Sequence, residues 1–120
     1  MQKNYIVSKS RERGVQMKEP TLGNPQNTIA VLQKYNFVFQ KKFGQNFLID
    51  THVLDKIIGS AEITKDDFVL EIGPGIGTMT QYLAQAAGKV IAVEIDKNLI
   101  PILEDTLSGY DNVRVINEDV

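Results

Sequence analysis

The sequence predicts an α/β protein in which parallel strands alternate with helices. From residue 66 onward, short apolar runs rich in β-branched residues alternate with segments whose apolar residues recur at helical spacing. Three glycines spaced two apart, Gly73, Gly75 and Gly77, separate the first run from the first helical segment. This order is typical of right-handed crossover units. We therefore expect three parallel strands joined by helices.

The first expected strand covers residues 67–72 and leads through the glycine loop into a helix over about residues 78–87. The expected buried stripe of this helix consists of Met79, Tyr82, Leu83 and Ala86. Gly88 is expected to stop the helix, because glycine is common just after a helix end. The second strand is expected at residues 89–95.

A further helix is expected after Asp96, whose carboxylate can cap it. Pro101 fits only near its first turn, because proline has no N–H to donate. The expected apolar side of this helix is Leu99, Ile100, Leu103 and Leu107. A third strand over residues 112–116 completes the order strand–helix–strand–helix–strand.

The first half of the chain is expected to be an arm that precedes this α/β unit. Residues 1–20 carry five Lys and Arg residues without a clear amphipathic period, so we expect a basic, flexible leader; Met17 is an alternative start. A short helix is expected over residues 27–35, with Asn27 or Thr28 as its N-cap. Asp50 is expected to cap the next helix, whose apolar positions Val53, Leu54, Ile57 and Ile58 share one face.

The composition excludes several classes of site. The chain has no cysteine and one histidine, which excludes disulfides and thiolate metal sites and argues against a zinc or iron centre. No apolar run approaches the roughly 18 residues of a membrane span, and the polar N-terminus lacks a signal-peptide core. We therefore expect a cytoplasmic protein with no membrane and no metal among its partners.

The net charge of −2 conceals two halves of opposite sign. Residues 1–60 hold nine Lys and Arg residues against four Asp and Glu residues, a charge of +5. Residues 61–120 hold four against eleven, a charge of −7. A polyanion suits the basic half and a neutral or cationic ligand suits the acidic half, although oppositely charged solvated surfaces explain the counts equally well.

Three acidic residues follow or end the expected strands. Glu71 lies just before the glycine loop, Glu94 lies 21 residues after Gly73, and Asp119 follows the third strand. The carboxyl ends of parallel strands form the ligand crevice of open α/β sheets, so these acids should converge there. Glu94 is placed to accept from two ribose hydroxyls, and Asp119 from an adenine amino group.

The glycine loop differs from the dinucleotide fingerprint G-x-G-x-x-G because its third glycine comes one residue early. It also contains no lysine that would offset phosphate charge. An acidic crevice suits S-adenosylmethionine better, since this cofactor offers a ribose, an adenine, an ammonium group and a sulfonium. Glycines needed only for a tight turn and close helix packing are the structural alternative.

Four segments of the sequence carry a resemblance to a known family. FGQNFLID (43–50), EIGPGIGTMT (71–80), VEID (93–96) and NEDV (117–120) resemble the KsgA-type ribosomal RNA adenine dimethyltransferases, from about residue 21 to residue 120. The resemblance implies a Rossmann-like class I S-adenosylmethionine-dependent methyltransferase fold, here with its first three parallel strands and their helices. It also implies dimethylation of two adjacent adenines in small-subunit (16S) rRNA, on the immature 30S subunit.

The resemblance assigns cofactor contacts to Asn46, Leu48, Gly73, Glu94 and Asp119. Lys41 and Lys42 are candidates for contacts with RNA phosphates, or are solvated surface. We expect residues 21–120 to be the arm and the cofactor-binding half of the domain, inactive alone.

The resemblance also concerns the catalytic residues. The catalytic tetrapeptide of the family is of the N-L-P-Y type and follows the fourth strand of the sheet. It is not found in these 120 residues, so we expect it to lie beyond Val120. No residue of the sequence is therefore a candidate for a direct catalytic role.

Three alternatives stay open from the sequence. The first is a macrolide-resistance-type methyltransferase of large-subunit rRNA, which shares the QNF core. The second is a non-catalytic RNA-binding assembly or transcription factor on the same scaffold, and the third is a nucleotide-dependent oxidoreductase. Among single residues, Phe37 and Phe39 are expected in the core, with base-stacking platforms as the alternative. His52 is expected to be structural, and Glu71 is expected to support the loop.

Overall fold

The computed structural model describes residues 20–37 and 50–119. Its elements, in chain order, are η1 (Thr21–Gly23), α2 (Pro25–Lys34), α3 (Thr51–Ser60), β1 (Phe68–Ile72), α4 (Thr78–Ala86), β2 (Lys89–Glu94), η3 (Lys97–Leu99), α5 (Ile100–Thr106) and β3 (Val113–Asn117). Every strand lies within one residue of its expected bounds, and the alternation predicted from residue 66 onward is confirmed. None of the helices in the described ranges is long and apolar enough to cross a bilayer.

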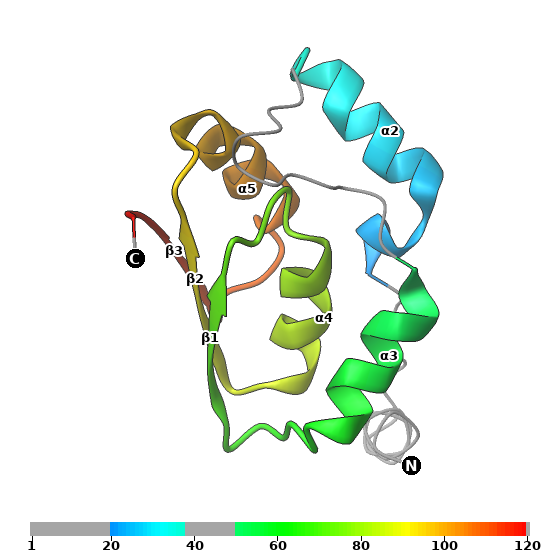
Figure 1. Cartoon of the computed structure of the whole chain (residues 1–120), viewed down its shortest axis with the longest axis vertical. Helices are drawn as coiled ribbons and strands as arrows, with labels where there is room; N and C mark the ends of the chain where they lie inside the picture. The colour runs from blue at the N-terminus through cyan, green and yellow to red at the C-terminus, as the bar shows by residue number, and fades with distance from the viewer. Residues whose placement is uncertain (1–19, 38–49, 120) are drawn as a thin grey trace.

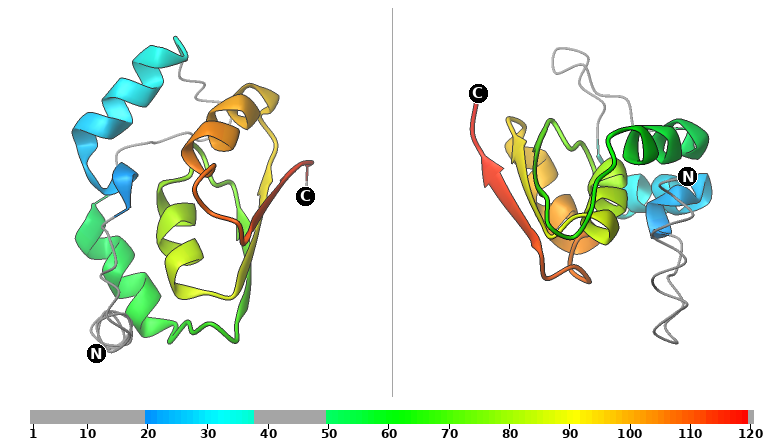
Figure 2. Two further views of the ribbon diagram at one scale, coloured as in Figure 1. Left: turned by 180° about the vertical axis from the view of Figure 1, so that it is seen from behind. Right: turned by 90° about the horizontal axis from the view of Figure 1, so that it is seen from below.

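The three strands form one parallel sheet in the order β1-β2-β3. The register pairs Glu71 with Ala92 and Glu94 with Asn117, so the carboxyl ends of the strands are level. The labelled helices lie on one face of this sheet, and α4 lies between the sheet and α3 (Figures 1 and 2). The parallel α/β prediction is therefore confirmed, with the crevice-forming ends of the strands at one edge.

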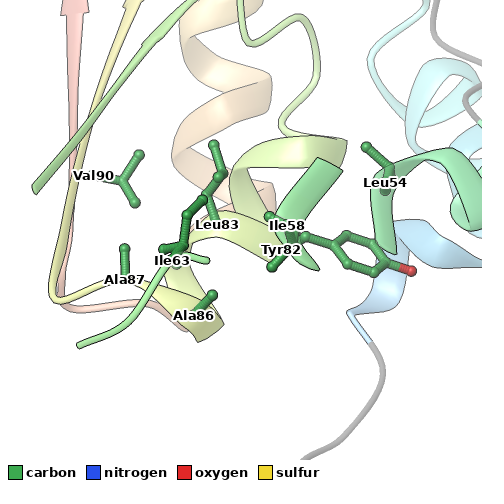
Figure 3. Close-up of a cluster of buried hydrophobic side chains, with 9 residues drawn as sticks. Leu54, Ile58, Ile63, Tyr82, Leu83, Ala86, Ala87 and Val90 are labelled. Atoms are coloured by element: carbon green, nitrogen blue, oxygen red, sulfur yellow. The ribbon is translucent and has the colours of Figure 1, made fainter. Parts of the chain in front are cut away.

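The core between the sheet and α3 is built around α4 (Figure 3). In Figure 3, Leu83 of α4 and Val90 of β2 lie on the sheet side, and the Tyr82 ring extends toward Leu54 of α3. The buried members of this cluster are Leu54, Ile58, Ile63, Tyr82, Leu83, Ala84, Ala86, Ala87 and Val90. The predicted stripe of α4 is confirmed for Tyr82, Leu83 and Ala86, whereas Met79 is only partly buried.

A second cluster joins α5 to the glycine loop and to the arm. Its buried members are Leu22, Ile76, Leu99, Ile102, Leu103 and Leu107, with Phe37 and other half-buried residues packed against them. Phe37 was expected in the core and is half-buried against this cluster, whereas Phe39 lies outside the described ranges. Ile102 was not expected in this cluster, and Ile100, which was expected on the apolar side, is only partly buried. A 3-10 turn with three residues per turn precedes α5, and it shifts the helical phase of the apolar residues that follow.

The helix α4 is buried on more sides than its sequence pattern predicted. Thr80 and Gln81, which lie outside the expected stripe, are 0% and 1% exposed. The reason is that α4 contacts β2, α3 and η1 together, so its polar positions face other elements instead of water.

The opposite face of β1 carries apolar side chains that remain exposed. Phe68, Leu70 and Ile72 alternate along the strand and are 67%, 63% and 58% exposed. Residues two apart in a strand share a face, so these three side chains form one apolar stripe on the side away from α4. Within the described ranges, β1 pairs only with β2, and its other edge is open.

Of the two expected N-caps in the arm, one needs correction. The N-cap of α2 is Asn24, whose side chain accepts from Gln26 N at 2.9 Å, with Pro25 following at the first turn. The expected caps, Asn27 and Thr28, lie inside that helix instead. Asp50 caps α3 as expected, by accepting from His52 N at 2.9 Å.

The expected apolar face of α3 is only half buried. Leu54 and Ile58 lie in the core, whereas Val53 and Ile57 are 49% and 43% exposed. The four positions span a wide arc of the helix, and α3 packs against α4 on one side of that arc.

Gly88 follows the end of α4, but close approach explains it better than helix capping. Ala87 is the C-cap of α4 and has an extended backbone. A Cβ added to Gly88 would lie 2.2 Å from the backbone oxygen of Lys65, so only glycine lets the two chain segments meet.

Candidate functional site

All three glycines of the loop have positive φ angles, a backbone conformation that favours glycine. Gly73, Gly75 and Gly77 have φ values of +72°, +63° and +99°. Other L-residues are strained in this left-handed region. Gly73 N also donates to Val93 O at 2.8 Å, which extends the pairing of β1 and β2 into the loop. The spacing that the sequence singled out is therefore a requirement of the loop conformation.

Glu94 is buried at the carboxyl end of β2 and binds the glycine loop directly. Its Oε1 accepts from Gly75 N at 3.1 Å, and its Oε2 accepts from Asp96 N at 2.9 Å. The side chain is 4% exposed. A carboxylate has about four lone-pair sites, so two remain for further donors.

Glu71 links the end of β1 to the first turn of α4. Thr80 Oγ1 donates to Glu71 Oε1 at 2.5 Å, across the loop that connects the two elements. Burial raises the pKa of Glu71 to about 7, the Thr80 hydrogen bond opposes this rise, and the nearby Glu94 carboxylate adds to it. This contact agrees with the supporting role expected for Glu71.

The third acid, Asp119, follows β3 by two residues and is exposed. Its neighbour Asn117, the last residue of β3, donates from Nδ2 to Glu94 O at 2.7 Å. This side chain ties the end of β3 to the end of β2. The sequence-predicted acids therefore follow three adjacent strand ends, and the Glu94 carboxylate acts electrostatically on Glu71.

The chemistry of these strand ends fits an adenosine carrying positive charge. Carboxylates can accept from a ribose diol or an amino group and can balance an ammonium or a sulfonium. A Cβ added at Gly73 would meet nothing within 4 Å, so the loop has open space at this position. In residues 20–37 and 50–119 no three acidic or histidine side chains converge into a metal-ligating set.

Several predictions fall on residues outside the described ranges. The expected site residues among them are Lys41, Lys42, Asn46 and Leu48. Val120, beyond which the catalytic tetrapeptide is expected, also lies outside the described ranges. The assignments on these residues and the expected place of the tetrapeptide therefore stay predictions.

Other polar residues of the described part contribute more than the sequence analysis indicated. His52 lies in the first turn of α3 and is exposed. Three polar residues that hold the site together, namely Thr80, Gln81 and Thr106, were not singled out. Thr80 and Gln81 are buried and Thr106 is half-buried. The one signal in the sequence was the presence of polar residue types on helices that pack into a core.

Comparison with known proteins places the chain in a defined group. Residues 36–120 match the family described as ribosomal RNA adenine dimethylase. The chain is 78% identical over 100 residues to ribosomal RNA small subunit methyltransferase A of Lachnoclostridium phytofermentans, covering 82% of the chain and 34% of that protein. It is 58% identical over 97 residues to the protein of the same name from Alkaliphilus metalliredigens, covering 81% and 34%. The chain thus spans about a third of the length of these relatives.

Solved structures give the same picture of the fold. The chain is similar to a dimethyladenosine transferase from Plasmodium falciparum, with a TM-score of 0.57 and 40% identity, covering 61% of the chain and 27% of that structure. It is also similar to the 23S rRNA methyltransferase ErmE, with a TM-score of 0.58 and 43% identity, covering 62% and 30%. A SAM-dependent methyltransferase from Aquifex aeolicus, 21% identical with a TM-score of 0.51, shares the fold and covers 55% and 38%.

Proposed function

Because the chain belongs to the ribosomal RNA adenine dimethylase family, we propose that it forms the cofactor-binding part of an rRNA adenine dimethyltransferase. The reaction transfers methyl groups from S-adenosylmethionine to two adjacent adenines of small-subunit (16S) rRNA on the immature 30S subunit. Residues 21–120 supply the arm and the first three strands of the methyltransferase domain, and residues 1–20 form a basic leader. Assembly of ribosomal subunits gives this activity a cytoplasmic location.

The observation that carries the proposal is the contact between Glu94 and the glycine loop. The carboxylate holds Gly75 N and Asp96 N, which fixes the loop beside the end of β2. Its two remaining lone-pair sites equal the number of free hydroxyls on the ribose of a 5′-substituted nucleoside. A buried acid with spare acceptors beside a lysine-free loop supports a nucleoside ligand without phosphates.

The other cofactor contacts follow the order of the strands. Gly73 offers the open side of the loop, Glu94 accepts from the ribose hydroxyls, and Asp119 accepts from the adenine amino group. Asn46 and Leu48 of the arm complete the set. When bound, S-adenosylmethionine supplies a methyl group on a positively charged sulfur. The residues of this chain bind and orient that group.

A binding measurement and an activity measurement test the proposal. Calorimetry with S-adenosylhomocysteine, the stable product that the cofactor becomes after methyl transfer, should detect one site per chain. Tritium transfer from labelled S-adenosylmethionine to immature small subunits, measured with the full-length protein, should exceed transfer to large-subunit rRNA. Binding without transfer to either subunit would favour the non-catalytic RNA-binding alternative.

The likeness to ErmE supports a second candidate function, methylation of large-subunit rRNA. At 43% identity it matches this chain about as well as the dimethyladenosine transferase structure does. The 78% identity to a small-subunit methyltransferase favours the first candidate. Label appearing mainly in large-subunit rRNA in the transfer experiment would reverse this order.

Lys41 and Lys42 are proposed to contact RNA phosphates. Each phosphate contact releases a counterion, so log affinity falls as log salt rises. Replacing both lysines with alanine should make this negative slope shallower by about 1.5. Cofactor affinity should stay unchanged. Lys89→Ala is the control, because Lys89 is exposed at the amino end of β2, away from the glycine loop. Equal slopes in the double variant and the wild type would mean that both lysines are solvated surface.

A further inference from the structure

The last turn of α5 packs against the glycine loop and forms a hydrogen bond with it. Thr106 Oγ1 donates to Ile76 O at 2.7 Å. A Cβ added to Gly77 would lie 3.0 Å from Thr106 Oγ1, 3.2 Å from Leu103 Cδ2 and 3.3 Å from Leu107 Cδ2. Ile76 itself is 1% exposed. The loop therefore lies directly against α5, and Thr106 satisfies a carbonyl that is buried in the loop.

Thr106 is itself held in place by a second hydrogen bond. Its backbone oxygen accepts from Gln81 Nε2 at 2.8 Å. Gln81 is 1% exposed, and its Oε1 accepts from Leu22 N at 2.9 Å. One continuous chain of hydrogen bonds therefore runs from η1 of the arm, through α4, to α5 and the glycine loop.

This anchorage matters because the loop cannot fix its own shape. Glycine populates positive and negative φ about equally, and the loop needs positive φ at Gly73, Gly75 and Gly77. External contacts must therefore select the conformation. Two side chains that reach the loop backbone, Glu94 and Thr106, approach it from β2 and α5. A ligand that binds a loop already in its bound shape loses less entropy on binding.

We propose that Thr106 is a positioning residue, whose hydroxyl holds the glycine loop in the shape that receives the cofactor. Gln81 fixes Thr106 and ties it to η1, the start of the arm. This inference rests on the proposed function, since it takes S-adenosylmethionine as the ligand of the loop. Thr106 acts on the ligand through the Ile76 carbonyl and the loop backbone on either side of it.

The test compares three substitutions near the end of α5. Thr106→Val removes the hydroxyl and keeps the side-chain shape, whereas Thr106→Ser keeps the hydroxyl. Ser108→Ala is the matched control, because Ser108 Oγ donates to Asp105 O at 2.8 Å without reaching the loop. The dissociation constant for S-adenosylhomocysteine is measured by calorimetry well below each unfolding temperature. If the valine variant does not fold, Thr106→Ala removes the same hydroxyl with less bulk.

We expect the dissociation constant to rise at least fivefold in Thr106→Val and to stay within twofold of wild type in Thr106→Ser and Ser108→Ala. In the full-length protein, KM for S-adenosylmethionine should rise while KM for the RNA substrate is unchanged. If Thr106→Val binds S-adenosylhomocysteine as tightly as the wild type, the inference about Thr106 is wrong and the proposed function stands. The same conclusion follows if Ser108→Ala weakens binding as much as Thr106→Val does. Absence of binding by the wild type would overturn the proposed function as well.

Discussion

The Glu94 carboxylate combines two tasks, since it holds the loop and is proposed to hold the ribose. Glu94→Ala should therefore weaken cofactor binding at least tenfold. Hydrogen bonds to a charged group are worth about 1.5–3 kcal/mol each, and a tenfold change corresponds to about 1.4 kcal/mol. Calorimetry with S-adenosylhomocysteine measures the effect. Glu118→Ala is the control, because it makes the same charge change at an exposed side chain. Unchanged affinity in a folded Glu94→Ala variant would remove the ribose assignment.

The raised pKa of Glu71 predicts a pH-dependent stability. The folded state keeps the proton up to about pH 7, whereas the unfolded chain loses it near 4.5. The contribution of Glu71 to the free energy of unfolding is therefore fully present below pH 4.5 and is lost as the pH rises to about 7. The loss is about 3 kcal/mol, from 1.36 kcal/mol per pKa unit.

Glu71→Gln should remove this dependence, because the amide does not titrate and still offers an oxygen to Thr80 Oγ1. The free energy of unfolding, measured by urea denaturation at about pH 5 and about pH 8, should fall more steeply in the wild type than in the variant. Parallel pH profiles would show that Glu71 titrates normally.

At the scale of elements, the connection from α4 to β2 depends on close contact with the turn before β1. A Cβ at Gly88 would lie 2.2 Å from Lys65 O, and this oxygen belongs to the backbone, which cannot rotate away. Gly88→Ala should lower stability by about 1–3 kcal/mol, the usual cost of overpacking. For a domain of this size, that lowers Tm by at least about 4 °C.

Gly109→Ala is the matched control for this prediction. A Cβ at Gly109 would meet nothing within 4 Å, so its Tm should stay close to that of the wild type. Differential scanning fluorimetry measures both variants. Equal Tm values for the two would show that the turn at Lys65 moves without cost.

At the scale of the whole molecule, the apolar stripe on β1 should promote association. Phe68, Leu70 and Ile72 are more than half exposed on a strand whose edge is open within the described ranges. Such an edge can pair with another chain, and exposed apolar patches favour contact. We expect the 120-residue polypeptide to form dimers or larger species in sedimentation velocity runs as its concentration rises.

Leu70→Lys should reduce this association, because it places a charge in the centre of the stripe. Ile29→Lys is the control, since Ile29 is an exposed apolar residue on α2 with 41% exposure. A monomer at all concentrations, or equal effects of the two substitutions, would show that the stripe on β1 is not the associating surface.

The sequence by itself determined the α/β alternation, the strand bounds to within one residue, the glycine loop and the positions of Glu71 and Glu94 near strand ends. These features are local: a period of two or 3.6 residues and a glycine at a turn are visible within a short window. The roles of Asn46, Leu48, Lys41, Lys42 and Asp119 stay predictions, drawn from the resemblance or the residue types. The same holds for the catalytic tetrapeptide expected after Val120.

Only the tertiary structure decided how the loop is supported. Gln81 reaches Leu22, 59 residues earlier in the chain, and Thr106 reaches Ile76, 30 residues earlier. No local period encodes such pairs, because they depend on how α4, α5 and η1 pack around one another. Gly88 follows the same rule: its sequence position suggested a helix stop, but the reason for a glycine there is the backbone of Lys65. A periodic pattern can be seen in a short stretch of sequence, whereas contacts between distant residues form only when the helices and strands pack together.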